Sequence, residues 1–144
     1  MRTLVLDTNI VLDLFVFADA RARPLHECLA RGRANWLATA AMRDELERVL
    51  AYAHIESKLD FYRLRADDVL GRFDKHAAIV RVPAKAPVTC KDPDDQKFID
   101  LAVAHRCWLL SKDAAVLAMT KRLALLDVIA AAAMPASSYS LIGA

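Results

Sequence analysis

Glycine, proline and cysteine are all scarce in this 144-residue chain, with three, five and three residues respectively. The shortage of glycine and proline argues against disorder. It also leaves no glycine-rich loop that could cradle the phosphates of a nucleotide. Apolar residues make up 56% of the sequence and charged residues 26%. The chain therefore has the material for a compact core that is rich in helix.

The three cysteines, Cys28, Cys90 and Cys107, are odd in number and widely spaced. That pattern suits neither a disulfide framework nor a zinc site built on paired cysteines. The four histidines do not supply a second pair of ligands at zinc-site spacing. We therefore expect a cytoplasmic protein with reduced thiols, which needs neither a disulfide nor a metal ion in order to fold.

Long apolar runs are also missing. Asp7 interrupts the first apolar run and Asp13 the next, so the N-terminus lacks the pattern of a secretory signal. The longest late stretch, Val128–Ala136, contains Pro135 and is far shorter than the roughly 20 residues of a membrane-spanning helix. We expect a soluble protein without a membrane partner.

The net charge of +2 gives no indication of a nucleic-acid partner by itself. It would gain meaning if several acids gathered at one place, because the remaining surface would then be more basic than the total suggests. Whether the acids do gather depends on the fold.

Short apolar runs alternate with amphipathic helical patterns along the chain. This alternation predicts a parallel sheet covered by helices, in a single α/β domain over residues 1–144. The expected strands are short and nearly all apolar, as buried parallel strands are. They are Thr3–Leu6, Trp36–Thr39, Ala78–Val82, Trp108–Ser111 and about Asp127–Ala131.

The segments between the strands have apolar residues spaced three and four apart, for example Met42, Leu46 and Leu50. The stretch Glu56–His76 has the same spacing and can form one helix or two, with Gly71 as a candidate breaker. Val82–Asp94 contains three prolines and predicts an irregular connection. The remaining helices are expected at about Asn9–Ala18, Pro24–Ala30, Gln96–Arg106 and Ala114–Arg122.

Four acids fall near one edge of the predicted sheet. Asp7 directly follows the first strand, and Asp113 lies two residues beyond the fourth. Asp95 comes just before a helix, and Glu45 lies early in the helix after the second strand. Ligands of open parallel sheets bind outside the carboxyl ends of the strands. We therefore expect the four carboxylates to converge there.

Converging carboxylates oppose one another's ionisation, and a hard divalent cation relieves that repulsion. Ligation by oxygen alone suits Mg²⁺ or Mn²⁺, and a retained water molecule can become a nucleophile that hydrolyses a phosphodiester. Each acid alone has a simpler explanation, as a helix cap, a first-turn acid favoured by the helix dipole or a solvated carboxylate. Only the joint arrangement favours a metal site, for one ion or two.

Four segments of the chain together resemble a PIN domain. They read Val5-Leu6-Asp7-Thr8-Asn9-Ile10, Arg43-Asp44-Glu45-Leu46, Asp92-Pro93-Asp94-Asp95-Gln96-Lys97-Phe98 and Leu109-Leu110-Ser111-Lys112-Asp113. Their order and spacing both fit, and the resemblance spans essentially the whole chain. It looks most similar to the bacterial toxin components of toxin-antitoxin pairs that are similar to VapC toxins.

The resemblance implies a three-layer α/β/α sandwich with a central, mostly parallel sheet of four to five strands. It implies an endoribonuclease that depends on Mg²⁺ or Mn²⁺, cleaves RNA, forms a homodimer and is restrained by a small antitoxin protein. The residues that match the family's catalytic and metal-binding acids are Asp7, Glu45, Asp95 and Asp113. The residues that match its supporting polar positions are Thr8, Asn9 and Ser111.

Two positions depart from the family pattern. The segment Ser111-Lys112-Asp113-Ala114 stands where the family often has Thr-Gly-Asp and a further acid, so a fifth carboxylate is missing and a lysine is brought close. Gln96 stands where Asn is usual. We interpret Lys112 as a residue that contacts phosphate or weakens metal binding. Arg43 and Arg48 are further candidate RNA contacts, although an ordinary helical surface also carries such arginines.

Other functions fit the same pattern less well. A haloacid-dehalogenase-like phosphatase also has an Asp after its first strand, but it normally needs a second Asp two residues on, where this chain has Asn9. A receiver-like domain needs an acid pair before its acceptor Asp, and Arg2–Leu6 has none. A PIN fold without catalytic activity, which binds RNA or a partner protein, stays open.

Overall fold

The computed structural model describes residues 1–135, and these residues form a five-stranded sheet in which neighbouring strands are all parallel. Residues 136–144, which include the end of the late apolar stretch, lie outside the described part. The strand order is β3-β2-β1-β4-β5. The strands are β1 (Arg2–Leu6), β2 (Ala34–Ala38), β3 (Ala77–Ile79), β4 (Trp108–Leu110) and β5 (Ile129–Ala131).

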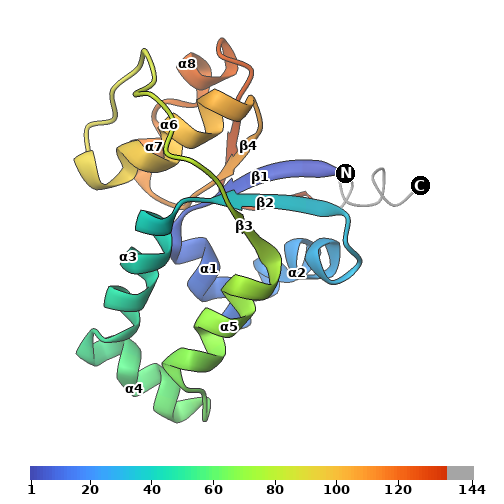
Figure 1. Cartoon of the computed structure of the whole chain (residues 1–144), viewed down its shortest axis with the longest axis vertical. Helices are drawn as coiled ribbons and strands as arrows, with labels where there is room; N and C mark the ends of the chain where they lie inside the picture. Colours follow the sequence, from blue (N-terminus) through green and yellow to red (C-terminus); the bar gives the residue numbers. More distant parts are fainter. Residues whose placement is uncertain (136–144) are drawn as a thin grey trace.

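Helices cover both faces of this sheet (Figure 1). On one side lie α1 (Thr8–Phe15), α2 (Arg23–Ala30), α3 (Ala40–Leu50), α4 (Ala53–Phe61) and α5 (Ala66–His76), and on the other lie α6 (Gln96–His105), α7 (Ala114–Leu117) and α8 (Thr120–Ala124). Two 3₁₀ turns, η1 (Ala20–Ala22) and η2 (Pro93–Asp95), precede α2 and α6. The expected three-layer α/β/α sandwich is confirmed. None of the helices in residues 1–135 is both long and apolar enough to cross a membrane.

Trp36 of β2 joins the sheet to the helices on one face. Its side chain is 1% exposed and packs edge-on against Phe73 of α5, with 4.9 Å between the ring centroids. Phe15 of α1 approaches the same indole at 6.1 Å. On the other side of the sheet, Ile99 and Leu101 of α6 are fully buried. The strands lie between two apolar layers, which explains why they read as nearly continuous apolar runs.

The strand expected at Ala78–Val82 is shorter and lies slightly earlier in the chain. The backbone N–H of Val80 still donates to the carbonyl oxygen of Ala38 at 2.8 Å, but pairing ends there. Pro83 follows, and a proline has no N–H to continue a ladder. The predicted strand was too long because local β propensity continues beyond Ala38, the residue at which the neighbouring strand β2 ends.

Two helical segments break at points that the prediction did not locate. Glu56–His76 forms two helices, and the break lies at Arg63, which has a left-handed φ of +56°, and not at Gly71, which lies inside α5. Ala114–Arg122 forms the short helices α7 and α8 in place of one helix. The apolar spacing is the same in one long helix and in two short ones, so spacing alone did not locate these breaks.

The carboxyl ends of β1 and β4 lie level with each other at one edge of the sheet. Leu6 pairs with Leu110, and the backbone N–H of Asp7 donates to the carbonyl oxygen of Leu110 at 2.9 Å. The segments that follow the two strands therefore start side by side. This register is what brings Asp7 next to Ser111 and its neighbours.

A long connection, residues 80–92, leads from β3 to η2 across the sheet (Figure 1). Two side chains of α6 hold it in place. Asp100 Oδ1 accepts a hydrogen bond from the backbone N–H of Ala86 at 2.8 Å, and Gln96 Oε1 accepts one from the backbone N–H of Cys90 at 2.7 Å. These bonds fix the position at which the connection reaches η2.

Candidate metal centre

Asp7 is buried at the end of β1, with a side chain that is 5% exposed. Among residues 1–135, no side-chain hydrogen bond caps α1 at its N-terminus. Oδ2 of Asp7 accepts a 2.6 Å hydrogen bond from the hydroxyl of Ser111, which is fully buried. Burial raises the pKa of Asp7, and the hydrogen bond from Ser111 acts in the opposite direction. The hydroxyl of Ser111 therefore orients this carboxylate from the neighbouring strand, and the backbone N–H of Asn9 in the first turn of α1 also lowers its pKa.

Asp95 is 6% exposed at the junction of η2 and α6. Its Oδ2 atom has no hydrogen-bond partner within residues 1–135, which is unfavourable for a buried polar atom. Burial raises the pKa of Asp95 to about 7, and contact with the Asp113 carboxyl group and the charges of Asp7, Asp113 and Asp92 act in the same direction. The surroundings of this carboxylate therefore favour a bound proton or a bound cation.

Asp92, Asp95 and Asp113 form a close acidic group. One carboxylate oxygen from each lies within 4.8 Å of the other two. Two of these acids also cap short helical turns: Asp113 Oδ1 accepts from the backbone N–H of Ala115 at 2.8 Å, and Asp92 Oδ1 accepts from that of Asp94 at 3.0 Å. Capping occupies one oxygen of each carboxylate and leaves the second oxygen for another ligand.

Asp92 is the member of this group that the sequence analysis did not single out. It precedes η2 and Asp95 ends η2, so the two acids are three residues apart across a 3₁₀ turn. Side chains with this spacing lie on the same face of a 3₁₀ helix. The motif Asp-Pro-Asp-Asp contained this signal. Asp92 also supplies a fifth carboxylate at an edge where the residue after Asp113 is an alanine.

Glu45 reaches the same edge from α3 but has different partners. The Thr8 hydroxyl donates to its Oε2, and Nζ of Lys97 lies 2.8 Å from its Oε1. The charge of Glu45 raises the pKa of Asp7, as does the charge of Asp113. The fold therefore brings all four predicted acids to one edge, with Glu45 held by a lysine beside the close acidic group.

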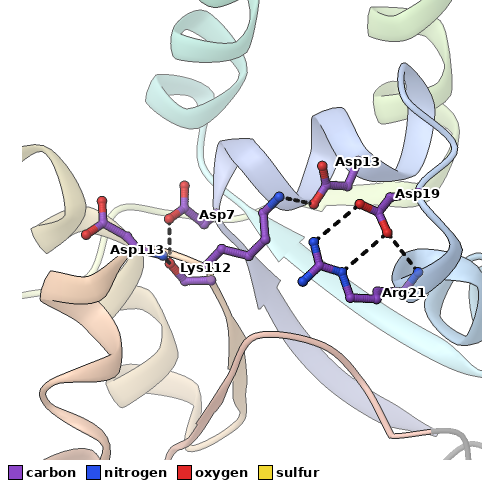
Figure 2. Close-up of polar contacts among 7 residues, drawn as sticks. Asp7, Asp13, Asp19, Arg21, Lys112 and Asp113 are labelled. Carbon is purple, nitrogen blue, oxygen red and sulfur yellow. Dashed lines mark hydrogen bonds and ion pairs between the residues drawn. The ribbon is translucent and has the colours of Figure 1, made fainter.

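Lys112 directly precedes Asp113, but its ammonium group is paired elsewhere. Figure 2 shows the side chain extending toward α1, where Nζ lies 2.6 Å from Oδ2 of Asp13. Asp13 is 8% exposed and the side chain of Lys112 is 33% exposed, so the acid of this ion pair is buried and the lysine is partly exposed. Beyond it, Asp19 and Arg21 form a second pair at 3.5 Å (Figure 2).

The other predicted site residues lie on the helices around the acids. Arg43 donates two hydrogen bonds, at 2.7 and 2.9 Å, to the carboxylate of Asp74 and so links α3 to α5. Arg48 is exposed on α3, and Asn9 is exposed on α1. The RNA contacts expected of the arginines and the supporting role expected of Asn9 stay predictions.

The donor set fits a hard divalent cation such as Mg²⁺ or Mn²⁺, because it consists of carboxylate oxygens. The structural observation that supports this fit is the unpartnered Oδ2 of the buried Asp95. A cation of this kind would activate a bound water molecule and could support hydrolysis of a phosphodiester.

Comparisons with known proteins identify the family and the fold. A family profile described as a PIN domain matches residues 3–115, more than half of the chain. The crystal structure of VapBC2 from Rickettsia felis, bound to a DNA fragment from their promoter, matches with a TM-score of 0.59 and 15% sequence identity, over 89% of this chain and 96% of that chain. Similarity at that identity shows a shared fold. A search of curated proteins found no match. On the strength of the family match, this chain belongs to the PIN-domain family.

Proposed function

We propose that this PIN domain is a divalent-metal-dependent endoribonuclease and the toxin of a toxin-antitoxin pair. The observation that carries the proposal is the buried, unpartnered Oδ2 of Asp95 in a close group with Asp92 and Asp113. Three carboxylates this near one another resist full ionisation unless a cation lies among them. Membership of the PIN-domain family supports the nuclease chemistry and leaves a haloacid-dehalogenase-like phosphatase without support.

The acids have different roles at the site. Asp92, Asp95 and Asp113 hold Mg²⁺ or Mn²⁺. Asp7, whose orientation is set by Ser111, adds a further negative charge beside them. When bound, the ion supplies Lewis-acid activation of water and of the phosphodiester. Glu45, held by hydrogen bonds from Thr8 and Lys97, adds its charge at the same edge.

Among the three expected RNA contacts, Arg48 is the most accessible. It is exposed on α3, one turn after Glu45, and so can reach a strand of RNA that crosses the acids. Arg43 and Lys112 are engaged with Asp74 and Asp13, and each must exchange that partner for a phosphate before it contacts RNA. An arginine fork suits phosphate recognition of this kind.

The partners are proposed from the resemblance to VapC toxins and from the likeness to VapBC2. We propose that a small antitoxin protein binds this chain and that the chain forms a homodimer. Purification with the product of a short adjacent reading frame would test the first point, and the mass of the purified protein in solution would test the second.

The nuclease proposal is tested by Mn²⁺ binding and by cleavage of single-stranded RNA. We compare the native chain with Asp7→Asn and with Asp60→Asn, which removes the same charge from an exposed position on α4. The native chain and Asp60→Asn should bind Mn²⁺ and cleave RNA, and Asp7→Asn should lose cleavage. A native chain that neither binds metal nor cleaves any of several RNAs overturns the proposal. RNA binding without cleavage would then identify a binding module.

The toxin role has its own test. Expression of the native chain in bacteria should slow growth, and expression of Asp7→Asn at the same level should not. Normal growth with a native chain that cleaves RNA in vitro would remove the toxin role and leave the nuclease activity in place.

A further inference from the structure

Lys97 of α6 places a positive charge at the sheet edge where Asp7, Glu45, Asp95 and Asp113 meet, which we call the acidic edge. Its Nζ atom lies 2.8 Å from Oε1 of Glu45 and 2.6 Å from the carbonyl oxygen of Asp94. The same ammonium group lies 4.9 Å from the centroid of the Phe98 ring. The side chain is 29% exposed, so the charge is partly shielded from solvent. These three contacts therefore fix an ammonium group that sequence patterns did not identify.

The two oxygens of Glu45 and the second oxygen of Asp95 are in opposite situations. Thr8 and Lys97 each donate to one oxygen of Glu45, so both of its oxygens have partners. Oδ2 of Asp95 is buried and has no partner in residues 1–135. One carboxylate at the acidic edge is thus paired with a cation of the chain itself, and the buried Oδ2 of Asp95 is not.

A lysine ammonium group is a compact point charge with three hydrogen-bond donors. Glu45 and the carbonyl oxygen of Asp94 accept two of them, which leaves the third for an oxygen outside the described residues. A phosphoryl oxygen of a bound RNA strand has the charge and the acceptor geometry for this donor.

We propose that Lys97 occupies the position of a second divalent cation, so that the site binds a single metal ion at Asp92, Asp95 and Asp113 and has a lysine ammonium at Glu45. This inference rests on the proposed function. Lys97 donates its third hydrogen bond to a phosphoryl oxygen and stabilises the negative charge that develops there during hydrolysis.

The number of Mn²⁺ ions bound per chain tests this inference directly. Electron paramagnetic resonance and calorimetric titration count the ions on the native chain, on Lys97→Met and on Lys121→Met, which removes the same charge from an exposed position on α8. The native chain and Lys121→Met should bind one ion. Lys97→Met should bind two, because Glu45 is left without its cation. The double variant Lys97→Met with Glu45→Gln should return to one.

Cleavage provides a second readout. With enough Mn²⁺ to fill only the first site, Lys97→Met should cleave RNA about tenfold or more slowly than the native chain. Additional Mn²⁺ should restore part of the rate in Lys97→Met and none in Lys121→Met. Lys97→Gln, which keeps a polar side chain, serves as the test variant if circular dichroism shows that Lys97→Met does not fold.

Two results overturn the inference and leave the nuclease proposal standing: two ions on the native chain, or one ion on Lys97→Met at saturating Mn²⁺. A native chain that binds no ion and cleaves no RNA overturns both proposals. The two failures are therefore distinguishable.

Discussion

The hydroxyl of Ser111 donates to Oδ2 of Asp7 at 2.6 Å and accepts from the backbone N–H of Asp113 at 3.1 Å. A single side chain thus ties the end of β4 to the end of β1 and supports two acids. In Ser111→Ala, Asp7 loses the donor that lowers its pKa, so we expect weaker Mn²⁺ binding near neutral pH. The free energy of unfolding should fall by about 1–2 kcal/mol.

Mn²⁺ titrations and urea unfolding measure these two effects. Ser111→Thr is the matched control, because it keeps the hydroxyl and should bind Mn²⁺ nearly as the native chain does. Equal Mn²⁺ affinity in Ser111→Ala and the native chain would contradict a positioning role for this hydroxyl.

The raised pKa of Asp95 predicts how the stability of the metal-free protein depends on pH. The folded-state pKa of about 7 lies above the ordinary value of 3.8, so the fold favours the protonated carboxyl group. Its contribution to stability is fully present below about pH 4 and is lost as the pH rises through about 7. The metal-free native chain should therefore be less stable at pH 8 than at pH 5.

Asp95→Asn should weaken this pH dependence, because an amide does not ionise. At pH 8 without metal, we expect the variant to be about 1–3 kcal/mol more stable than the native chain. Urea unfolding in the presence of a chelator measures the difference, with Asp60→Asn as the control. A variant that is less stable than the native chain at pH 8 would instead indicate that Asp95 acts mainly as a cap.

The same pKa predicts that protons compete with metal ions. A carboxylate must be deprotonated to bind Mn²⁺, so binding near pH 6 should release protons and tighten as the pH rises to 8. Calorimetry in buffers with different ionisation enthalpies counts the protons released. Binding that is independent of pH across this range would show that Asp95 is not among the ligands.

The pair between Lys112 and Asp13 predicts a loss of stability rather than a gain when the lysine is removed. Lys112→Met leaves Asp13, whose side chain is 11% exposed, without its partner. We expect the free energy of unfolding to fall by about 1–3 kcal/mol, less than for a fully buried pair, because the lysine is 33% exposed. Chemical denaturation at pH 7 measures the change.

Arg21→Met is the control for this experiment, since Arg21 is 71% exposed in its pair with Asp19. An exposed pair of this kind contributes about 0–1 kcal/mol, so the control should unfold almost as the native chain does. Equal effects in Lys112→Met and Arg21→Met would contradict the structural role of the buried pair.

The hydrogen bonds of Asp100 predict that the position of the connection at residues 80–92 affects metal binding. Its Oδ1 accepts from the backbone N–H of Ala86 and from the amide of Gln96, both at 2.8 Å. In Asp100→Ala the connection loses this anchor, and Asp92 at its end should be held less firmly. We expect faster proteolysis within residues 80–92 and about two- to fivefold weaker Mn²⁺ binding, a loss of roughly 0.4–1 kcal/mol.

Asp100→Asn keeps a carbonyl oxygen as an acceptor and should lie close to the native chain in both measurements. Faster proteolysis with unchanged Mn²⁺ affinity in Asp100→Ala would show that the connection does not position Asp92.

The sequence alone determined the parallel sheet and the edge at which the acids meet. Apolar runs such as the one before Asp7 predict buried strands, and the first polar residue after a buried strand marks its carboxyl end. Strand ends in a parallel sheet share an edge, so the positions of Asp7 and Asp113 followed from local pattern. The break between α4 and α5 could not be located from local pattern, because a left-handed residue such as Arg63 has no reliable signature in apolar spacing.

Only the tertiary structure decided which charges are paired at and near that edge. Lys97 meets Glu45 across 52 residues of sequence, and Lys112, which lies between β4 and α7, meets Asp13 of α1. No local pattern encodes the direction of a long, flexible side chain, because its rotamer is selected by partners that arrive only when distant elements pack. Asp7, Glu45, Asp95 and Asp113 could therefore be predicted from the sequence, whereas the part played by Asp92 and the partners of Lys97 and Lys112 could not.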